Sequence, residues 1–210
     1  MGVSYGIIFT IQNMEGVINI RIVVGISGAS GAIFGIKILE SLHELGVETY
    51  LIISDWAKAT INLETNYSLK EVESLATVVH SKNNLAASVS SGSFRVDGMI
   101  IAPCSMKTLA SIRVGFSDNL ISRTADVMLK EHKKLILLTR ETPLNTIHLE
   151  NMLALSQMGV VILPPTPAFY NNPSCIDDVV NHIVARTLDQ LDIENDLTKR
   201  WESKLKTINF

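Results

Sequence analysis

Two turns rich in glycine and serine have the residue types that bind a phosphate group. The first, Gly25–Gly31, reads Gly-Ile-Ser-Gly-Ala-Ser-Gly and follows an apolar run. Glycine lets the backbone approach an anion closely, and a helix that begins beyond the turn offers free N–H groups. Ser27 and Ser30 add hydroxyl groups. The pattern predicts a phosphate site, and a tight turn without a ligand is the alternative.

The second turn, Pro103–Thr108, reads Pro-Cys-Ser-Met-Lys-Thr. Ser105 is a suitable N-cap for a following helix, and Lys107 brings a positive charge close to the helix amides. An ordinary helix cap is the alternative interpretation. Cys104 has no histidine nearby in the sequence that would activate it, so we expect a buried, unreactive thiol.

The first turn also favours one kind of nucleotide. Its glycine spacing is not Gly-x-Gly-x-x-Gly. Ser54 stands at the end of the next apolar run, where dinucleotide-binding proteins carry an acidic residue for the ribose. A mononucleotide or a flavin therefore fits the pattern better than NAD.

Carboxylates beside these turns are candidates for proton transfer. Glu141 follows Arg140 directly after an apolar run, so both are expected at the end of a strand. An arginine there can bind a phosphate or a carbonyl group, and a glutamate can move a proton. A surface ion pair is the alternative for this pair, and a solvated surface position is the alternative for Glu64.

Cations and aromatic residues in the second half of the chain are candidates for binding an anionic substrate. Arg123 and Lys130 are seven residues apart on one expected helix, so they share a face that either binds an anion or is only solvated. Tyr170 lies in a proline-rich loop, and Arg186 lies on an otherwise apolar helix where it needs an anion or an exit to water. Trp201 either serves a ligand or packs on a neighbour.

Strand and helix patterns alternate along the chain. This order predicts an α/β fold, a doubly wound parallel sheet with helices on both faces. In such sheets, ligands bind outside the carboxyl ends of the strands, where the segments above are placed. The expected strands are 18–26, 48–54, 99–103, 134–139 and 160–163, and the expected helices are 32–45, 56–64, 105 onward, 119–131, 144–158 and 176–191. We expect one domain over 21–201, an N-terminal extension over 1–20 and a C-terminal tail over 202–210.

Composition excludes several classes of protein. The formal net charge of −3 gives no reason to expect nucleic acid or an anionic membrane as a partner. No apolar run is long enough to span a bilayer, and the first twenty residues carry only Glu15 as a charge. The two cysteines are not in a Cys-x-x-Cys spacing and the five histidines show no metal-binding spacing, so we expect a reducing, cytoplasmic setting and no metal.

Several separated motifs together resemble the UbiX flavin prenyltransferases, in the branch associated with phenolic-acid (4-hydroxybenzoate) decarboxylases. The motifs are Gly28–Gly31, Pro103–Ser105, Asn119–Val127, Arg140–Glu141 and Ile147–Met152. The resemblance covers residues 21–201. It implies a flavodoxin-like Rossmann three-layer sandwich that assembles as a homododecamer with FMN at the interfaces between chains.

The resemblance also implies a reaction. Members of this family join a dimethylallyl group from dimethylallyl monophosphate to N5 and C6 of reduced FMN. The prenylated FMN then serves a UbiD-type decarboxylase. The positions that match FMN-contacting residues are Gly28, Ala29, Ser30, Ser54, Ser105, Met106, Lys107, Thr108 and Arg140.

The remaining matches concern the prenyl donor and the chemistry. Ser30, Glu64 and Glu141 match the positions implicated in the reaction. The positions matching the prenyl-phosphate site or its neighbourhood are Arg123, Lys130, Arg140, Tyr170, Arg186 and Trp201. Ser90–Ser93 resembles a serine–glycine loop that lies near the flavin. Lys107 is a departure, because many relatives have a small residue there.

Two other functions are weighed against this one. A flavin-dependent cysteine decarboxylase would carry a histidine after the second strand and a Pro-x-Met-Asn-x-x-Met-Trp stretch, whereas this chain has Glu64 and Pro143–His148. A non-catalytic FMN-binding accessory protein of a decarboxylase would have no use for a prenyl-phosphate site.

Overall fold

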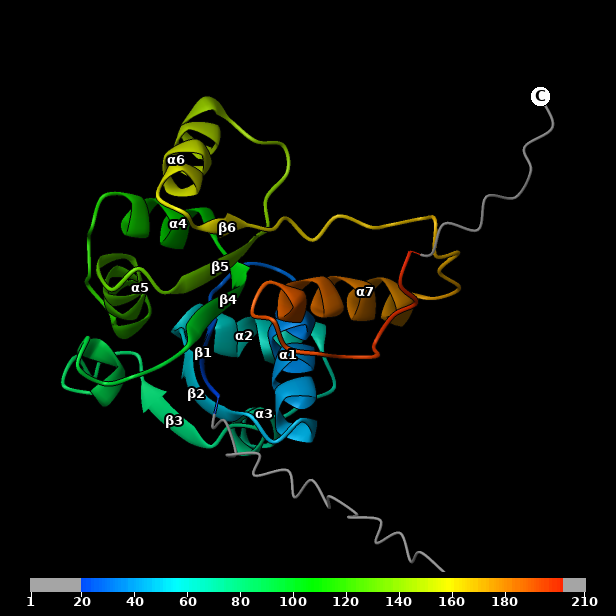
Figure 1. Cartoon of the computed structure of the whole chain (residues 1–210), viewed down its shortest axis with the longest axis horizontal. Coiled ribbons are helices and arrows are strands. Elements are labelled where there is room, and N and C mark those ends of the chain that lie inside the picture. The colour runs from blue at the N-terminus through cyan, green and yellow to red at the C-terminus, as the bar shows by residue number, and fades with distance from the viewer. Residues whose placement is uncertain (1–19, 202–210) are drawn as a thin grey trace, which may run out of the picture.

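The computed structural model describes residues 20–201, and its centre is a six-stranded parallel sheet (Figure 1). The strand order is β3-β2-β1-β4-β5-β6, with the switch point between β1 and β4. The bounds are β1 Arg21–Ile26, β2 Glu48–Ile53, β3 Val78–Ser81, β4 Gly98–Cys104, β5 Lys134–Thr139 and β6 Val161–Ile162. This arrangement confirms the predicted doubly wound fold.

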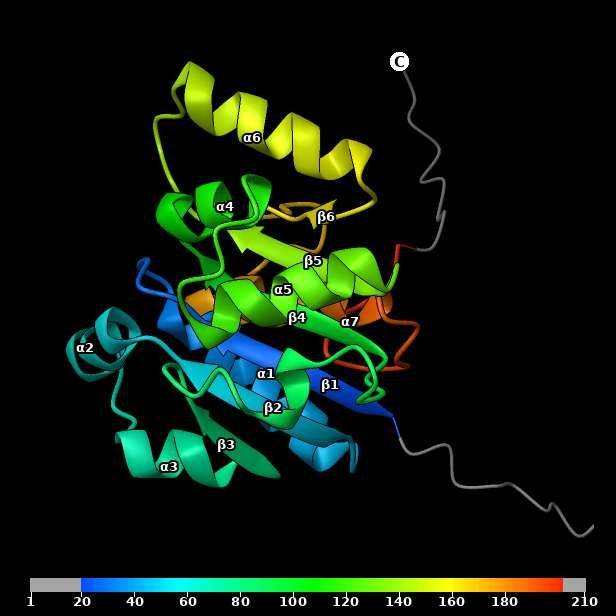
Figure 2. The ribbon, with the colours of Figure 1, turned by 90° about the vertical axis from the view of Figure 1, so that its left-hand side faces the viewer.

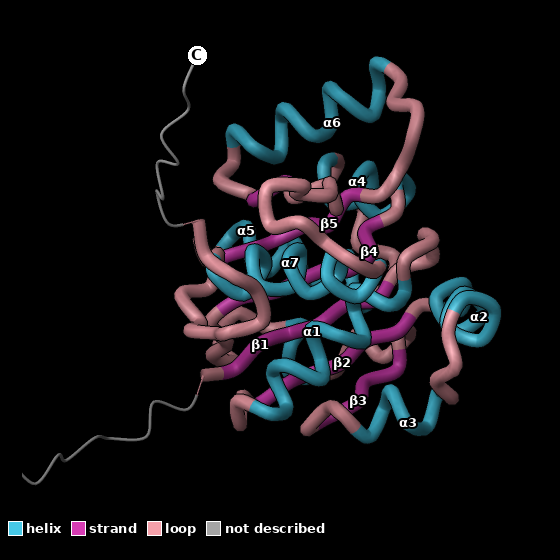
Figure 3. Tube along the Cα trace, turned by 90° about the vertical axis from the view of Figure 1, so that its right-hand side faces the viewer, coloured by secondary structure: helices cyan, strands magenta, loops and turns pink. Residues whose placement is uncertain are grey.

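Helices cover both faces of the sheet and complete a three-layer sandwich (Figures 2 and 3). Residues of α1, α2, α3 and α7 pack into one core cluster, and residues of α4, α5, α6 and the short helix η1 pack into the other. The bounds are α1 Ala32–Glu44, α2 Asp55–Glu64, α3 Leu69–Ser74, η1 Ser88–Ser90, α4 Met106–Arg113, α5 Leu120–Lys130, α6 Thr146–Gln157 and α7 Ile176–Asp189. No helix within residues 20–201 is both long and apolar enough to cross a membrane.

Three elements were not expected from the sequence. Strand β3 has only four residues, and it lies at the edge of the sheet with alternating partial burial, so it lacks the long apolar run of its neighbours. Helix α3 is short, although Ser68 and Glu71 form the reciprocal capping box that marks its start. Helix η1 is a single turn. The expected extension over 1–20, apart from Ile20, and the expected tail over 202–210 lie outside the described residues.

One buried hydroxyl group joins the carboxyl ends of the two central strands. Ser27, 1% exposed, donates a hydrogen bond from Oγ to the Pro103 carbonyl at 2.8 Å. The same Oγ accepts a hydrogen bond from the Ser105 backbone N–H at 2.8 Å. The only hydroxyl proton of Ser27 is therefore used inside the protein. The expectation that Ser27 donates to a ligand is wrong, and Ser27 fixes the two turns relative to each other instead.

We predict that Ser27→Ala destabilises the protein by about 1–3 kcal/mol, because it removes the hydroxyl partner of the part-buried Ser105 N–H and one of the two hydrogen bonds that the Pro103 carbonyl accepts from Ser27. Ser41→Ala is a matched control, since Ser41 is also buried but bonds a carbonyl within its own helix, Lys37 O, at 2.8 Å. Denaturant unfolding of both variants measures the difference. An equal loss in the two variants would contradict the bridging role of Ser27.

Candidate functional site

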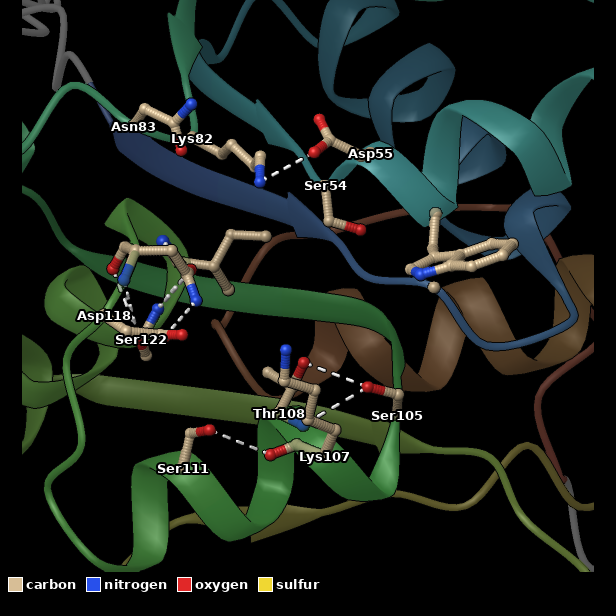
Figure 4. Close-up of a pocket in the computed structure, with 14 residues that line it drawn as sticks. Ser54, Asp55, Lys82, Asn83, Ser105, Lys107, Thr108, Ser111, Asp118 and Ser122 are labelled. Atoms are coloured by element: carbon tan, nitrogen blue, oxygen red, sulfur yellow. Dashed lines mark hydrogen bonds and ion pairs between the residues drawn. The ribbon is translucent and has the colours of Figure 1, made fainter.

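Three helices begin at one pocket on the carboxyl side of the sheet (Figure 4). Ser54 caps α2 by accepting from Ala57 N at 3.2 Å, and Ser105 caps α4 by accepting from Thr108 N at 3.2 Å. Asn119 caps α5 by accepting from the N–H groups of Ile121 and Ser122 at 2.9 and 3.2 Å. Each helix N-terminus carries a partial positive charge and spare N–H groups, so their convergence creates an anion-binding site.

The charged side chains of this pocket add to that field. Lys82 and Lys107 line the pocket, whose volume is about 570 Å³, together with Asp55 and Asp118. Lys82 Nζ lies 2.7 Å from Asp55 Oδ2 at the rim, which leaves Lys107 as the cation of the lining without an ion pair among the described residues (Figure 4). Lys107 therefore places a cation without an ion pair at the start of α4.

Gly28 lies where this pocket meets α2. A Cβ atom built on Gly28 would stand 2.4 Å from Trp56 Cβ, a distance at which backbone must move. The glycine thus serves a close approach of the two turns, as its place in the motif suggests. Trp56 is 76% exposed and lines the pocket, although it was not among the expected site residues.

The structure corrects the expected phosphate position at the start of α1. Glu64, at the end of α2, accepts hydrogen bonds from Gly31 N at 2.7 Å and from Ala32 N at 3.3 Å. A carboxylate of the protein therefore already occupies the amides on which the prediction depended. The phosphate site favoured by the structure lies instead among the caps of α2, α4 and α5.

A second pocket lies on the other side of the first glycine turn. Ser30, Arg140 and Glu141 line it together with Pro164–Thr166, and its volume is about 380 Å³. Glu141 accepts a hydrogen bond from Thr142 N at 3.1 Å, and both Arg140 and Glu141 are exposed. The predicted acid, cation and hydroxyl group are therefore neighbours in one chain. Because the turn 28–31 contributes residues to both pockets, it lies between them.

Arg123 and Lys130 lie elsewhere, on α5 beside the serine–glycine loop. Arg123 donates from Nε to Ser90 O at 3.2 Å and pairs with Asp126 at 2.8 Å. Lys130 forms an ion pair with Glu131, against which a side chain at position 92 would collide. Within the described chain, neither cation lines the two pockets above.

Tyr170, Arg186 and Trp201 form a third group. Arg186 pairs with Asp189 at 2.7 Å and lines a groove that shares Pro164 and Thr166 with the second pocket. Tyr170 is 49% exposed and contacts Trp201 edge to face, with ring centroids 5.2 Å apart. Figure 1 places α5 and the loop beyond β6 on opposite sides of the molecule. One chain therefore does not bring all the predicted phosphate ligands together.

One residue of the expected site, Met106, faces the interior, and so does Cys104, which was expected to be buried. Met106 packs against the core, so its backbone rather than its side chain is available to a ligand. Cys104 is buried, and burial raises the pKa of its thiol, which agrees with an unreactive cysteine. Ala29 is half-buried in the first turn.

Within residues 20–201, no group of three or more histidine, cysteine or acidic residues has a metal-binding arrangement.

Sequence reasoning missed many residues of the first pocket, which come from the start of α2, the segment after β3, α4 and the start of α5. The unpredicted lining residues are Asp55, Trp56, Lys82, Asn83, Ser111, Asp118, Asn119, Ile121 and Ser122. A signal existed for Asn119, a good N-cap residue ahead of an amphipathic helix. Lys82 and Asn83 follow the short edge strand that the sequence did not reveal.

The chain is similar to proteins of known type over most of its length. A family model described as Flavoprotein matches residues 12–188. A probable UbiX-like flavin prenyltransferase of Bacillus subtilis is 62% identical over 87% of this chain and 89% of its own length.

Two solved structures share both fold and sequence with the chain. The structure of AnUbiX (PadA1) in complex with FMN and dimethylallyl pyrophosphate has 55% identity and a TM-score of 0.87, over 88% of this chain and 98% of that one. The dodecameric FMN-dependent UbiX-like decarboxylase of Escherichia coli O157:H7 has 56% identity and a TM-score of 0.86, over 87% of this chain and 100% of that one. The strand-end pockets, the motifs in their order and this similarity lead to one conclusion: the chain belongs to the UbiX-like flavin prenyltransferases of the Flavoprotein family.

Proposed function

We propose that this protein is a flavin prenyltransferase that joins a dimethylallyl group from dimethylallyl monophosphate to N5 and C6 of reduced FMN. The observation that carries the proposal is the convergence of three capped helix N-termini on a strand-end pocket. A relative with 55% identity is known in complex with FMN and dimethylallyl pyrophosphate, which supports FMN and a dimethylallyl phosphate ester as ligands.

The residues of the first pocket fit FMN. Its phosphate is a dianion that accepts hydrogen bonds from helix amides and hydroxyl groups, which Ser54, Ser105 and Thr108 present there. Lys107 supplies a positive charge on the same wall. Gly28 allows the turn to lie close to α2, so a flat ligand can extend from this pocket past residues 28–31 toward Ser30 and Arg140.

Reduced FMN supplies the nucleophilic atoms, and the protein must assist departure of the phosphate from the prenyl donor. In this step the bond between the allylic carbon and the phosphate oxygen breaks, and the electron pair leaves with the phosphate. We assign Arg140, Tyr170 and Arg186 to this phosphate, with Arg123 and Lys130 supplied by a neighbouring chain. Arginine and tyrosine donors offset the growing negative charge.

The remaining roles concern the allylic cation and the protons. Trp201 offers an aromatic face, and cation–π attraction contributes about 2 kcal/mol in a site without water. Closing the new ring requires that the prenyl double bond gains a proton and that C6 of the flavin loses one. We assign the C6 proton to Glu141, which lines the second pocket. Ser30 lies in the same pocket and orients the reacting edge. Glu64 acts through the turn, because it holds Gly31 and Ala32.

A homododecamer is the proposed assembly. Helix α6 buries only Leu155 in the chain, whereas Ile147, Leu149 and Leu153 are 52–64% exposed. Such an apolar surface is typical of an interface between chains. The dodecameric relative supports this assembly. In it, we assign the cations of α5 to the pocket of another chain.

We further infer a cytoplasmic enzyme that passes its product to a UbiD-type decarboxylase. The free cysteines, Cys104 and Cys175, agree with a reducing compartment. The proposed catalytic domain spans 21–201, with 1–20 as an extension and 202–210 as a tail.

The mass of the flavin tests this function. The protein is mixed with FMN, a reductant and dimethylallyl monophosphate under anaerobic conditions, and the flavin is then analysed by mass spectrometry. We expect a gain of one five-carbon prenyl unit. An unchanged mass would favour a non-catalytic FMN carrier, and loss of CO2 from a cysteine substrate would favour a cysteine decarboxylase.

We predict that Gly28→Ala weakens FMN binding by roughly tenfold or more, because the new methyl group collides with Trp56 Cβ at 2.4 Å and forces the turn away from α2. Fluorescence titration of FMN measures the affinity. Trp56→Gly provides the reference, and the double variant should recover affinity toward that reference. Independent, additive losses in the double variant would contradict the steric explanation.

We predict that Glu141→Gln lowers the rate of prenylated FMN formation by about a hundredfold, because the amide cannot accept the proton. FMN affinity should stay within about twofold, since the amide keeps the shape of the carboxyl group. Glu44→Gln, an exposed change at the end of α1, is the control. Full turnover by Glu141→Gln would remove this carboxylate from the mechanism.

A further inference from the structure

Tyr170 and Trp201 have little support from the core. Tyr170 is 49% exposed and Trp201 is 72% exposed. Their rings contact each other edge to face, and the Tyr170 ring also meets His182 of α7 edge to face, with centroids 5.8 Å apart. Two aromatic side chains assigned to substrate therefore depend on local contacts for their positions.

A group of three polar side chains holds the backbone segments that carry these rings. The Asn171 side-chain nitrogen lies 3.1 Å from His182 Nδ1 and donates to Thr198 Oγ1 at 3.2 Å. His182 Nδ1 lies 3.4 Å from Thr198 Oγ1. Because an amide nitrogen only donates, His182 Nδ1 accepts, and the neutral ring carries its proton on Nε2.

The group joins three separate parts of the chain. Asn171 follows Tyr170 in the loop after β6, His182 is on α7, and Thr198 is three residues before Trp201. Through His182 and the direct bond from Asn171 to Thr198, the loop 164–173 is connected to the segment 194–201. A separate contact joins the C-terminal segment to α7 without involving the loop 164–173, because Arg200 donates to both carboxylate oxygens of Asp189.

We propose that His182 is a positioning residue of the prenyl-phosphate site, which fixes Tyr170 and Trp201 relative to each other through Nδ1 and the edge of its ring. The inference rests on the function proposed above and adds to it a residue that need not touch the substrate. His182 lines the groove that contains Arg186, and it also lines the pocket that contains Asn171. It therefore lies between the Arg186 groove and the loop that carries Tyr170.

Protonation of His182 should release this contact. A proton on Nδ1 would face the N–H groups of Asn171, so the acceptor would be lost. Burial lowers the pKa of His182, and Arg186 and Arg200 lower it further, while Asp189 raises it. The histidine is thus neutral near pH 7, and the contact weakens only as the pH falls below the usual histidine range, about 6.5. The other charged or titratable groups around it are Tyr170, Asp178, Asp196 and Lys199.

Two variants separate the two parts of the proposal. His182→Phe keeps an aromatic ring against Tyr170 but has no acceptor, whereas His182→Asn places an acceptor oxygen close to the position of Nδ1. We expect His182→Phe to raise KM for dimethylallyl monophosphate roughly five- to tenfold, as loss of one part-buried hydrogen bond implies. We expect His182→Asn to lie nearer the wild type, and both variants to bind FMN normally. His43→Phe, an exposed histidine on α1, is the control.

The pH profile and the fluorescence of Trp201 supply readouts that a general loss of stability would not reproduce. KM of the wild type should rise at acidic pH, and His182→Asn should remove that rise. In a Trp56→Phe background Trp201 is the only tryptophan, and His182→Phe should increase its quenching by acrylamide.

A wild-type KM in His182→Phe would overturn the proposal. So would an equal loss in both variants together with weakened FMN binding. If the wild-type protein makes no prenylated FMN, the proposed function fails, while the tryptophan measurement still tests the position of Trp201.

Discussion

The hydrogen bonds of Ser27 are the constraint on which the strand-end pockets depend. Through one buried hydroxyl group, the turn after β1 is joined to both the Pro103 carbonyl group and the Ser105 amide at the turn after β4. The end of β2 is joined to the same place, because Ser54 N donates to Ile26 O at 3.0 Å. The N-caps of α2 and α4 are consequently held at fixed positions, and the N-termini of both helices face the first pocket.

This constraint explains why the proposed sites for the FMN phosphate and for the prenyl donor lie in different parts of the molecule. The amides beside the central strands are rigidly placed and suit a contact with the nucleotide phosphate that lasts through the reaction. Apart from Arg140, which follows β5, the residues assigned to the prenyl donor are on α5, on α7, in the loop beyond β6 and after α7, where exposure is high and ion pairs are local. A small phosphate ester can bind at such a surface, which is completed by another chain in the proposed assembly.

Most of the fold could be predicted from the sequence because the central strands are long and apolar and the helices have clear caps. Gly28, Ser105 and Arg140 were also placed correctly at strand ends, since parallel strands deliver their following loops to one edge. The predicted phosphate position at the start of α1 was wrong, because polar side chains there bond the protein itself. Ser27 and Glu64 have the residue types of ligand donors and acceptors, but their partners are backbone groups that are distant in sequence. Lys82 and Asn83 were missed because a four-residue edge strand leaves almost no pattern.

The central claim is that Arg123 of one chain and Arg186 of another serve the same prenyl phosphate. Mixed oligomers test it directly: Arg123→Ala and Arg186→Ala chains are purified separately, each with little activity, and then co-assembled. Shared sites would contain some pairs with both arginines intact, so prenylation should rise well above that of either parent. Activity that stays at the level of the parents in verified mixed oligomers would contradict a site built from two chains.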